Sequence, residues 1–445
     1  KVFSGVSVKG VTLEEMEEIK DLNYVKKISP NFKVYATLDE SVSLIGASDV
    51  WVQDVNGALC QETGEECLTG KGVTIAIIDT GVDYTHPDLG GCIGTGCKVI
   101  AGYDFINNDG DPMDDQGHGT HVAATAAGNG VLKGVAPDAN IVAFKVLGSD
   151  GSGTFDGILG AIEASYGLEY GDIDIISLSL GATCSFYGIS LGYSDFCGPE
   201  DPISTAINLA SENGVISVVA AGNSGPKSAT IATPGTAKKA ITVGATYKKD
   251  YTSSFFSDYC FEEEHFPGIN DVSCFSSRGP VVWLNGVLHK PDVVAPGVEI
   301  CAAQWSDAFE FYIRGERPDI HKCIDDDHIA ISGTSMATPH VAGAAALLLQ
   351  KYPEWNPDEI KSALKSTSID LGFDSSIQGS GRVDLVAATS LISAPPFGEI
   401  TTSGPVSNLV NIEGSATGRD FLRYTLYYGL SNQEIWTEIY SSETQ

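Results

Sequence analysis

The stretch Val73-Thr-Ile-Ala-Ile-Ile-Asp-Thr-Gly81 decides the fold, because it is a short apolar run that ends abruptly in turn-forming residues. Similar apolar runs recur at residues 141–146, 173–178, 215–220 and 240–243. Such runs are typical of strands that are buried on both faces. Helical stretches separate them, at residues 118–127, 156–164 and 202–212. The alternation predicts an α/β fold: a mostly parallel sheet with helices on both faces, and functional residues at the carboxyl ends of the strands.

Two smaller regions flank this central part. Residues 1–38 have the pattern of a strand, a short amphipathic helix and an extended segment, and they are too few to bury a good core alone. Residues 394–398 (Ala-Pro-Pro-Phe-Gly) predict a linker. Residues 400–445 alternate apolar and polar side chains, which predicts a truncated β-sandwich. We therefore expect three parts, at residues 1–38, 39–393 and 394–445.

Charge and hydropathy exclude some classes of partner. The chain has 58 acidic and 26 basic residues, a formal charge of −32, so it would repel the phosphates of a nucleic acid. The same surplus is compatible with cation binding, with a high-salt environment or simply with high solubility. No apolar run is long enough to span a bilayer, and the first ten residues do not resemble a signal peptide.

Ten cysteines fall into five close pairs: Cys60/Cys67, Cys92/Cys97, Cys184/Cys197, Cys260/Cys274 and Cys301/Cys323. None forms the CxxC motif of zinc ribbons or thioredoxin-like proteins. Five local disulfides, formed in an oxidising compartment, fit this pattern better than buried free thiols do.

Three segments carry residue types that catalyse reactions. Ile75-Ala-Ile-Ile-Asp-Thr-Gly81 delivers Asp79 at the carboxyl end of a strand. In Gln116-Gly-His-Gly-Thr-His121, glycines allow a tight turn that places His118 at the start of a helix. In Ser332-Gly-Thr-Ser-Met-Ala-Thr-Pro-His340, Ser335 opens a long apolar helix.

Each segment is ambiguous by itself. Asp-Thr-Gly also occurs in aspartic proteases, but those need two such carboxylates and this chain has one motif. A His-x-x-His pair can bind a metal, yet the catalytic Glu of HExxH is missing. Ser335 alone could be a helix cap, and His118 a core or capping residue. Because all three segments occur in one chain, we expect a joint catalytic role for them and not these separate roles.

The segments IIDTG, GHGTHVA and GTSMATPHVAG closely resemble the Asp, His and Ser signatures of the subtilisin-like serine proteases (subtilases), in that family's order. The resemblance covers about residues 39–393. It implies a secreted serine endopeptidase with Asp79, His118 and Ser335 as its catalytic triad. Ser335 would attack the scissile carbonyl, His118 would transfer the proton, and Asp79 would orient the imidazole.

The resemblance also implies how the transition state and the substrate are bound. In Val219-Ala-Ala-Gly-Asn-Ser224, Asn223 would donate to the oxyanion beside the Ser335 amide. The alternative is an ordinary Gly-Asn turn. An extended peptide would pair with two edges and place a large apolar or aromatic P1 side chain in a roomy pocket. The expected edge residues are Gly151, Ser152, Gly153, Ser179, Leu180 and Gly181, and the expected pocket residues are Ala220, Ala221 and Gly222.

Structural Ca²⁺ is the expected cofactor. The segment from Asp104 to Asp115 resembles a calcium loop of some subtilases, with Asp104, Asp109, Asp111 and the Met113 carbonyl as ligands. The alternative is a solvated Asp/Asn turn. Asp88 matches another calcium ligand of the family, although the loop that usually completes that site, at residues 127–133 here, is shortened.

Residues 1–38 resemble the later part of a subtilase propeptide, an inhibitor of its own protease. We expect self-cleavage near the bond between Leu38 and Asp39, since an apolar Leu38 suits the predicted pocket. Segments 184–197, 251–275 and 303–327 look like insertions on the surface of a monomer. Two other classes remain open: a catalytically dead scaffold used for binding, and a C-terminal β module that binds carbohydrates or surfaces.

Overall fold

The structure, a computed structural model, describes Leu22 and residues 40–167, 169–183, 185–186, 189–190, 197–251, 267–283, 286–306, 323–400, 414–418, 423–429 and 436–443. The chain divides into two compact units, Lys1–Ala36 and Thr37–Gln445. The predicted strand, helix and extended segment of residues 1–38, and the cleavage point near Leu38, lie outside the described residues. Everything below concerns the second unit.

Seven parallel strands form the main sheet in the order β11-β8-β7-β4-β1-β3-β2. Their bounds are β1 Thr74–Asp79, β2 Val99–Asp104, β3 Asn140–Lys145, β4 Ile175–Leu178, β7 Ile216–Ala220, β8 Ile241–Thr246 and β11 Val293–Pro296. The predicted parallel sheet is confirmed, and the five predicted strands are all present. The edge strands β2 and β11 escaped prediction because β2 is only half-buried along most of its length and β11 is four residues ending in proline.

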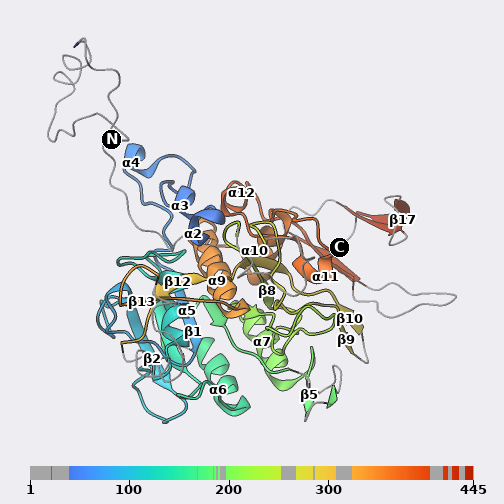
Figure 1. Cartoon of the computed structure of the whole chain (residues 1–445). Helices are drawn as coiled ribbons and strands as arrows, with labels where there is room; N and C mark the ends of the chain where they lie inside the picture. Colours follow the sequence, from blue (N-terminus) through green and yellow to red (C-terminus); the bar gives the residue numbers. More distant parts are fainter. Residues whose placement is uncertain are drawn as a thin grey trace. The chain divides into compact units, whose positions relative to one another are not determined.

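Helices cover both faces of this sheet, because side chains alternate along each strand (Figure 1). In β1, Ile75 and Ile77 pack in one core with helices α5 (His118–Ala127) and α9 (Thr334–Lys351). Ala76 and Ile78 pack in a second core with α6 (Phe155–Ser165) and α7 (Pro202–Glu212). Helix α9 contacts α5 and five strands of the sheet, β1, β4, β7, β8 and β11.

The remaining elements are short. The helices are α2 Ser41–Leu44, α3 Ala47–Val50, α4 Cys60–Thr63, the 3-10 turn η1 Pro87–Leu89, α10 Pro357–Ser366, α11 Ser375–Gln378 and α12 Leu385–Thr389. The strands form two-stranded antiparallel pairs: β5 Ser185–Phe186 with β6 Ile189–Ser190, β9 Val281–Trp283 with β10 Gly286–Leu288, and β12 Ile300–Ala303 with β13 His328–Ile331. Helix α10 begins with a capping box, in which Asn356 and Glu359 satisfy each other's backbone amides.

The C-terminal part consists of antiparallel strands in the residues that are described. Strand β14 (Phe397–Ile400) pairs with β15 (Gly414–Thr417), and β16 (Tyr424–Gly429) pairs with β17 (Trp436–Ser442). The described residues after 398 lie mainly in strands, and the all-β character of the whole segment stays a prediction. The β-sandwich itself stays a prediction, since these are two separate two-stranded sheets.

The disulfides follow the predicted local pattern. Bonds join Cys60 to Cys67, Cys92 to Cys97 and Cys301 to Cys323. Cys197 and Cys274 are disulfide-bonded as well, but Cys184 and Cys260, their predicted partners, lie outside the described residues. No described cysteine is free.

Candidate active site

Asp79 is the last residue of β1, at the point in the parallel sheet where the order of the strands reverses. After β1 the chain builds β2 and β3 on one side, and then crosses to place β4 on the other side of β1. In open α/β sheets the crevice outside the carboxyl ends at such a switch point is where ligands bind. The carboxylate of Asp79 is fully buried there.

His118 is the first residue of α5, and its Nδ1 lies 2.7 Å from Oδ1 of Asp79. The helix can approach the end of β1 because residue 119 is glycine. A Cβ there would lie 2.1 Å from the carbonyl oxygen of Gly81 and 3.1 Å from Cβ of Asp79. Gly119 is therefore required for the contact between His118 and Asp79.

The electrostatics of this pair favour a protonated imidazole. Burial disfavours the charged ring, but the charge and hydrogen bond of Asp79 outweigh it, so the pKa of His118 lies above its usual value. The Asp79 Oδ1 atom also accepts the Thr80 amide at 2.7 Å, whereas its Oδ2 accepts no hydrogen bond from any residue that the structure describes. The His118 side chain remains 24% exposed, so one edge of the ring can reach a substrate.

Ser335 is the second residue of α9, where backbone N–H groups have no acceptor within the helix. Its hydroxyl donates to the carbonyl of Ser179 at 3.0 Å, and the Ser179 hydroxyl donates to the carbonyl of Ser335 at 2.8 Å. These two bonds tie the start of α9 to the segment that follows β4. Within the described residues no hydrogen bond joins Ser335 to His118. For Ser335 to donate to His118, rotation about χ1 would have to turn its hydroxyl away from the Ser179 carbonyl. Hydrogen bonds between catalytic side chains often tighten only when substrate binds.

Asn223 follows β7 and is held in one orientation by Thr334. Its Oδ1 accepts the Thr334 amide at 2.9 Å and the Thr334 hydroxyl at 3.0 Å, so its Nδ2 points elsewhere. A Cβ placed on Gly333 would lie 3.5 Å from Nδ2 of Asn223 and 3.6 Å from the Ser335 amide nitrogen. The two expected oxyanion donors therefore border the same space, and glycine at 333 keeps a side chain out of it.

The expected substrate edges differ in exposure. Gly151, Ser152 and Gly153 are exposed, and the Gly148 amide donates to the Ser152 carbonyl at 2.9 Å, so this segment turns back on itself. Ser179 is buried against Ser335, Leu180 is half-buried, and Gly181 is exposed.

The three expected pocket residues are not placed alike. Ala220 and Ala221 are both buried, and Ala221 packs against Ile231 and Val281. Gly222 is half-buried, and its amide donates to the Thr334 hydroxyl at 3.2 Å. The structure thus brings Gly222 next to the oxyanion donors, whereas Ala221 contributes to a small apolar core.

The expected calcium loop is hydrogen-bonded to itself. The Asp104 carboxylate accepts the Ile106 and Asn107 amides at 2.7 and 2.9 Å. Asp109 accepts the Asp111 amide at 2.9 Å, and Asp111 accepts the Tyr84 hydroxyl at 2.9 Å and the Met113 amide at 3.3 Å. Over the described ranges, no three acidic, histidine or cysteine side chains gather as a metal site would require. These hydrogen bonds suit the Asp/Asn turn, which was the alternative, and the calcium ligand set expected from the sequence stays a prediction.

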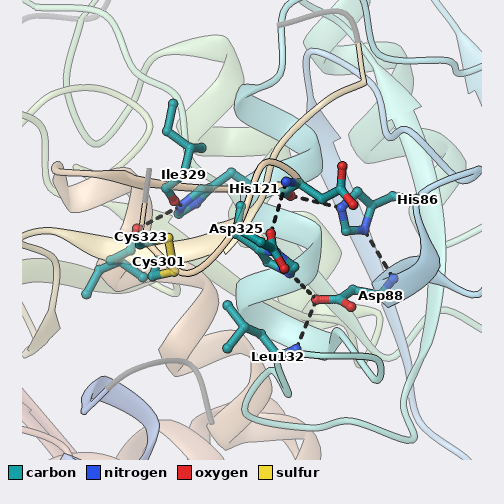
Figure 2. The surroundings of a disulfide bond; sticks show 11 residues. His86, Asp88, His121, Leu132, Cys301, Cys323, Asp325 and Ile329 are labelled. Atoms are coloured by element: carbon teal, nitrogen blue, oxygen red, sulfur yellow. Dashed lines mark hydrogen bonds and ion pairs between the residues drawn. A yellow bond between two sulfur atoms is a disulfide. The ribbon is translucent and has the colours of Figure 1, made fainter. Parts of the chain in front are cut away.

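The Asp88 carboxylate accepts several hydrogen bonds, and Figure 2 shows the one from Leu132. Its Oδ1 accepts the Val131 amide at 2.7 Å, and its Oδ2 accepts the Leu132 amide at 3.2 Å and Nε2 of His328 at 2.9 Å. The shortened loop packs so tightly that a Cβ on Gly130 would lie 2.1 Å from Oδ1 of Asp88. Three hydrogen bonds thus reach the Asp88 carboxylate, and its role as a calcium ligand stays a prediction.

Two supporting residues were missed by the sequence analysis. Asp114 is buried and accepts the amides of Gln116, Gly117 and Thr120, each at 2.9 Å, which fixes the turn before His118. The Thr80 hydroxyl accepts the Gly119 amide at 2.8 Å and joins the segments that carry Asp79 and His118. Asp is favoured in turns because its carboxylate can accept the amide two residues further on, and this signal could have identified Asp114.

Comparisons with known proteins agree with this fold. Residues 70–386 match the model of the subtilase family. Serine protease AprX of Bacillus subtilis (strain 168) is 37% identical over 378 residues, covering 82% of this chain and 74% of AprX. Subtilisin BL of Lederbergia lenta is 34% identical over 329 residues, covering 72% of this chain and 92% of that protein. Minor extracellular protease Vpr of Bacillus subtilis (strain 168) is 28% identical over an alignment of 545 residues, covering 88% of this chain and 61% of Vpr.

The class that these matches define is a serine protease, a hydrolase with a subtilisin-like α/β fold. The chain belongs to the subtilase family. Among the described residues, no helix has the length and apolarity needed to cross a membrane.

Proposed function

We propose that the chain is an endopeptidase in which Asp79, His118 and Ser335 form the catalytic triad. The observation that carries this proposal is the 2.7 Å contact between His118 and a fully buried Asp79 at the switch point of the sheet. The start of α9, with Ser335 in its first turn, packs against the same edge through Ser179. Together these contacts supply a base, its orienting carboxylate and a nucleophile.

The chemistry follows from these contacts. The Nδ1–H of His118 donates to Asp79, which leaves Nε2 free to take the proton of the Ser335 hydroxyl as it attacks the scissile carbonyl. The resulting imidazolium is stabilised by Asp79 and delivers its proton to the leaving amine. Water then attacks the acyl group with His118 again as the base, and this step releases the acyl group from Ser335.

The oxyanion would be held by Nδ2 of Asn223 and the amide of Ser335. Thr334 supports this role, because its amide and hydroxyl both fix Oδ1 of Asn223 and so direct Nδ2 away from them. Donors that are already oriented stabilise the transition state without reorganisation. The N-terminal end of α9 adds a favourable dipole to the same charge.

Substrate binding is proposed to occur by addition of an extended peptide between residues 151–153 and 179–181. Main-chain pairing carries little sequence information, so specificity would be broad. The enzyme would also prefer a large apolar or aromatic P1 residue. The P1 pocket would be formed more by the half-buried Gly222 than by Ala221, because Ala221 is buried in a small apolar core.

Three further proposals concern the enzyme as a whole. Residues 1–38 would be a partial inhibitory propeptide removed near Leu38, residues 39–393 the catalytic domain, and residues 394–445 a linker with part of a β-sandwich. Secretion is supported by the disulfides and by a relative named as an extracellular protease. The enzyme would act as a monomer. Structural Ca²⁺ at the segment from Asp104 to Asp115 is a further proposal, and the chemistry of the triad does not depend on it.

A peptide library tests the proposed activity. Purified enzyme should cleave internal bonds of peptides, mainly after large apolar residues, and Ser335→Ala should abolish cleavage while retaining the fold. In subtilisin itself, loss of the triad serine lowers kcat by about a million-fold, and we expect a loss of that order. Cleavage by Ser335→Ala at the wild-type rate would refute the triad.

A further inference from the structure

Lys145 is a buried lysine at the catalytic end of the sheet. It is the last residue of β3, its Cα is in register with that of Asp79 on the neighbouring strand β1, and its side chain is 1% exposed. The rest of β3 is apolar apart from Asn140, so a lysine here breaks the pattern of the strand.

The ammonium of Lys145 contacts three different segments. Its Nζ donates to the carbonyl of Thr80 at 2.7 Å, to Oδ1 of Asp115 at 2.5 Å and to the carbonyl of Leu147 at 2.8 Å. An ammonium has three donors and no acceptor, so all of its hydrogen-bonding capacity is used.

Each of these acceptors belongs to a segment of the proposed catalytic machinery. Thr80 directly follows Asp79, and its hydroxyl also holds the Gly119 amide next to His118. Asp115 lies three residues before His118, in the turn fixed by Asp114. Leu147 opens the loop that leads to the substrate edge at residues 151–153, and it bridges to Gly153.

Stability alone does not account for a charge at this place. Removing an ammonium from water is costly, and replacing a buried ion pair by apolar residues of similar size is often neutral or stabilising. We propose that Lys145 is a positioning residue, which fixes the Asp79 segment, the His118 turn and the substrate loop relative to one another. This inference rests on the proposed function of the triad.

Lys290 provides a matched control for this proposal. It is also fully buried, and its Nζ donates to Oδ2 of Asp292 at 2.6 Å and to the carbonyl of Ala240 at 2.8 Å. These contacts lie beside β8 and β11, at the far side of the sheet order from β3. Lys290 therefore resembles Lys145 in being buried and in donating to a carboxylate and a carbonyl, and its contacts among the described residues involve no segment of the triad. Its carboxylate differs, because Asp292 is buried and also pairs with Lys361 and Lys365.

The test compares Lys145→Met with Lys290→Met. Methionine keeps the apolar stem and removes the donors. Rates should be measured on purified full-length protein, per folded active site and well below the melting temperature. We expect Lys145→Met to lower kcat by up to about 100-fold with a smaller change in KM, because small displacements of catalytic groups cost this much. Lys290→Met should lower the melting temperature and leave kcat unchanged.

A second variant keeps the test decisive if Lys145→Met does not fold. Asp115 is 44% exposed, so Asp115→Ala removes one acceptor without emptying a core position, and it should lower kcat several-fold. Unchanged kcat in the folded Lys145 variant, or in Asp115→Ala if the first does not fold, would overturn the positioning role. Activity that persists in Ser335→Ala would instead overturn the proposed function, so the two failures can be told apart.

Discussion

Asp79 and Asp88 are both buried aspartates paired with a histidine, yet their surroundings differ. Asp79 lies 2.7 Å from His118, and Asp88 lies 2.9 Å from His328. The Oδ2 of Asp79 accepts no hydrogen bond from the part of the chain that the structure describes. Both oxygens of Asp88 accept hydrogen bonds, from the amides of Val131 and Leu132 and from His328.

The histidines differ even more than the aspartates. His118 uses only Nδ1 within the described ranges, and its side chain is partly exposed. His328 is 2% exposed, and its Nδ1 contacts Asp325 at 2.5 Å while Nε2 contacts Asp88. Although burial opposes charge, the two carboxylates raise the pKa of His328. One pair has a ring nitrogen available for proton transfer, whereas the other has both nitrogens committed to structure.

The same substitution at the two aspartates should separate these roles most clearly. Asp79→Asn is expected to lower kcat by about ten-thousand-fold, because the amide favours the wrong tautomer of His118. Asp88→Asn should leave kcat within a few-fold of the wild-type value. Equal losses of activity in both variants, measured with one peptide substrate, would break the distinction.

Removal of an oxyanion donor should have the next largest effect. Asn223→Ala is expected to lower kcat about 100- to 1,000-fold with little change in KM, because the donor acts mainly in the transition state. A matched control is Asn213→Ala, since Asn213 is an exposed residue at the end of α7. A larger change in KM than in kcat for Asn223→Ala would indicate a role in substrate binding instead.

The pH dependence should follow His118. Its neutral form is the base, so activity is lost as the pH falls and the ring is protonated. Because Asp79 raises the pKa of His118, the midpoint of the acid limb of kcat/KM should lie above the ordinary histidine value of 6.5. Asp79→Asn should move this midpoint downward, and Asp88→Asn should not move it.

The smallest effect on activity, and a clear effect on stability, is expected at Asp88. In Asp88→Asn, one of the donors around the carboxylate must face the new NH₂ group, which leaves it unpaired and destabilises the fold by roughly 1–3 kcal/mol. Melting temperatures should be measured in a Ser335→Ala background to prevent self-digestion. If chelation of calcium lowers the melting temperature of that protein to the same extent, a cation and not His328 stabilises this region.

The sequence predicted the main sheet well, for a physical reason. Buried strands and the glycine-flanked His118 leave strong local patterns, and parallel strands bring distant residues to one edge. Helix α5 begins at His118 as expected. Contacts between distant segments left no such pattern, for example the bond between Ser335 and Ser179 or the one between Asp88 and His328.

The calcium loop shows where sequence patterns are ambiguous. The carboxylates of residues 104–111 suit both a calcium site and an Asp/Asn turn, because both need closely spaced oxygens. Which of these two structures forms depends on the direction in which the carboxylates point. In the structure the Asp104 oxygens face amides of their own turn, which is a matter of backbone conformation.

Labelling with a serine-directed phosphonate tests the central claim most directly. The reagent bonds covalently only to a serine activated by a neighbouring base, and mass spectrometry of the digested protein identifies the modified residue. We predict one label per active chain, on Ser335, with none in Ser335→Ala, strongly slowed labelling in Asp79→Asn and normal labelling in Asp88→Asn. A folded wild-type protein that takes up no label, or that is labelled at a serine other than 335, would contradict the account.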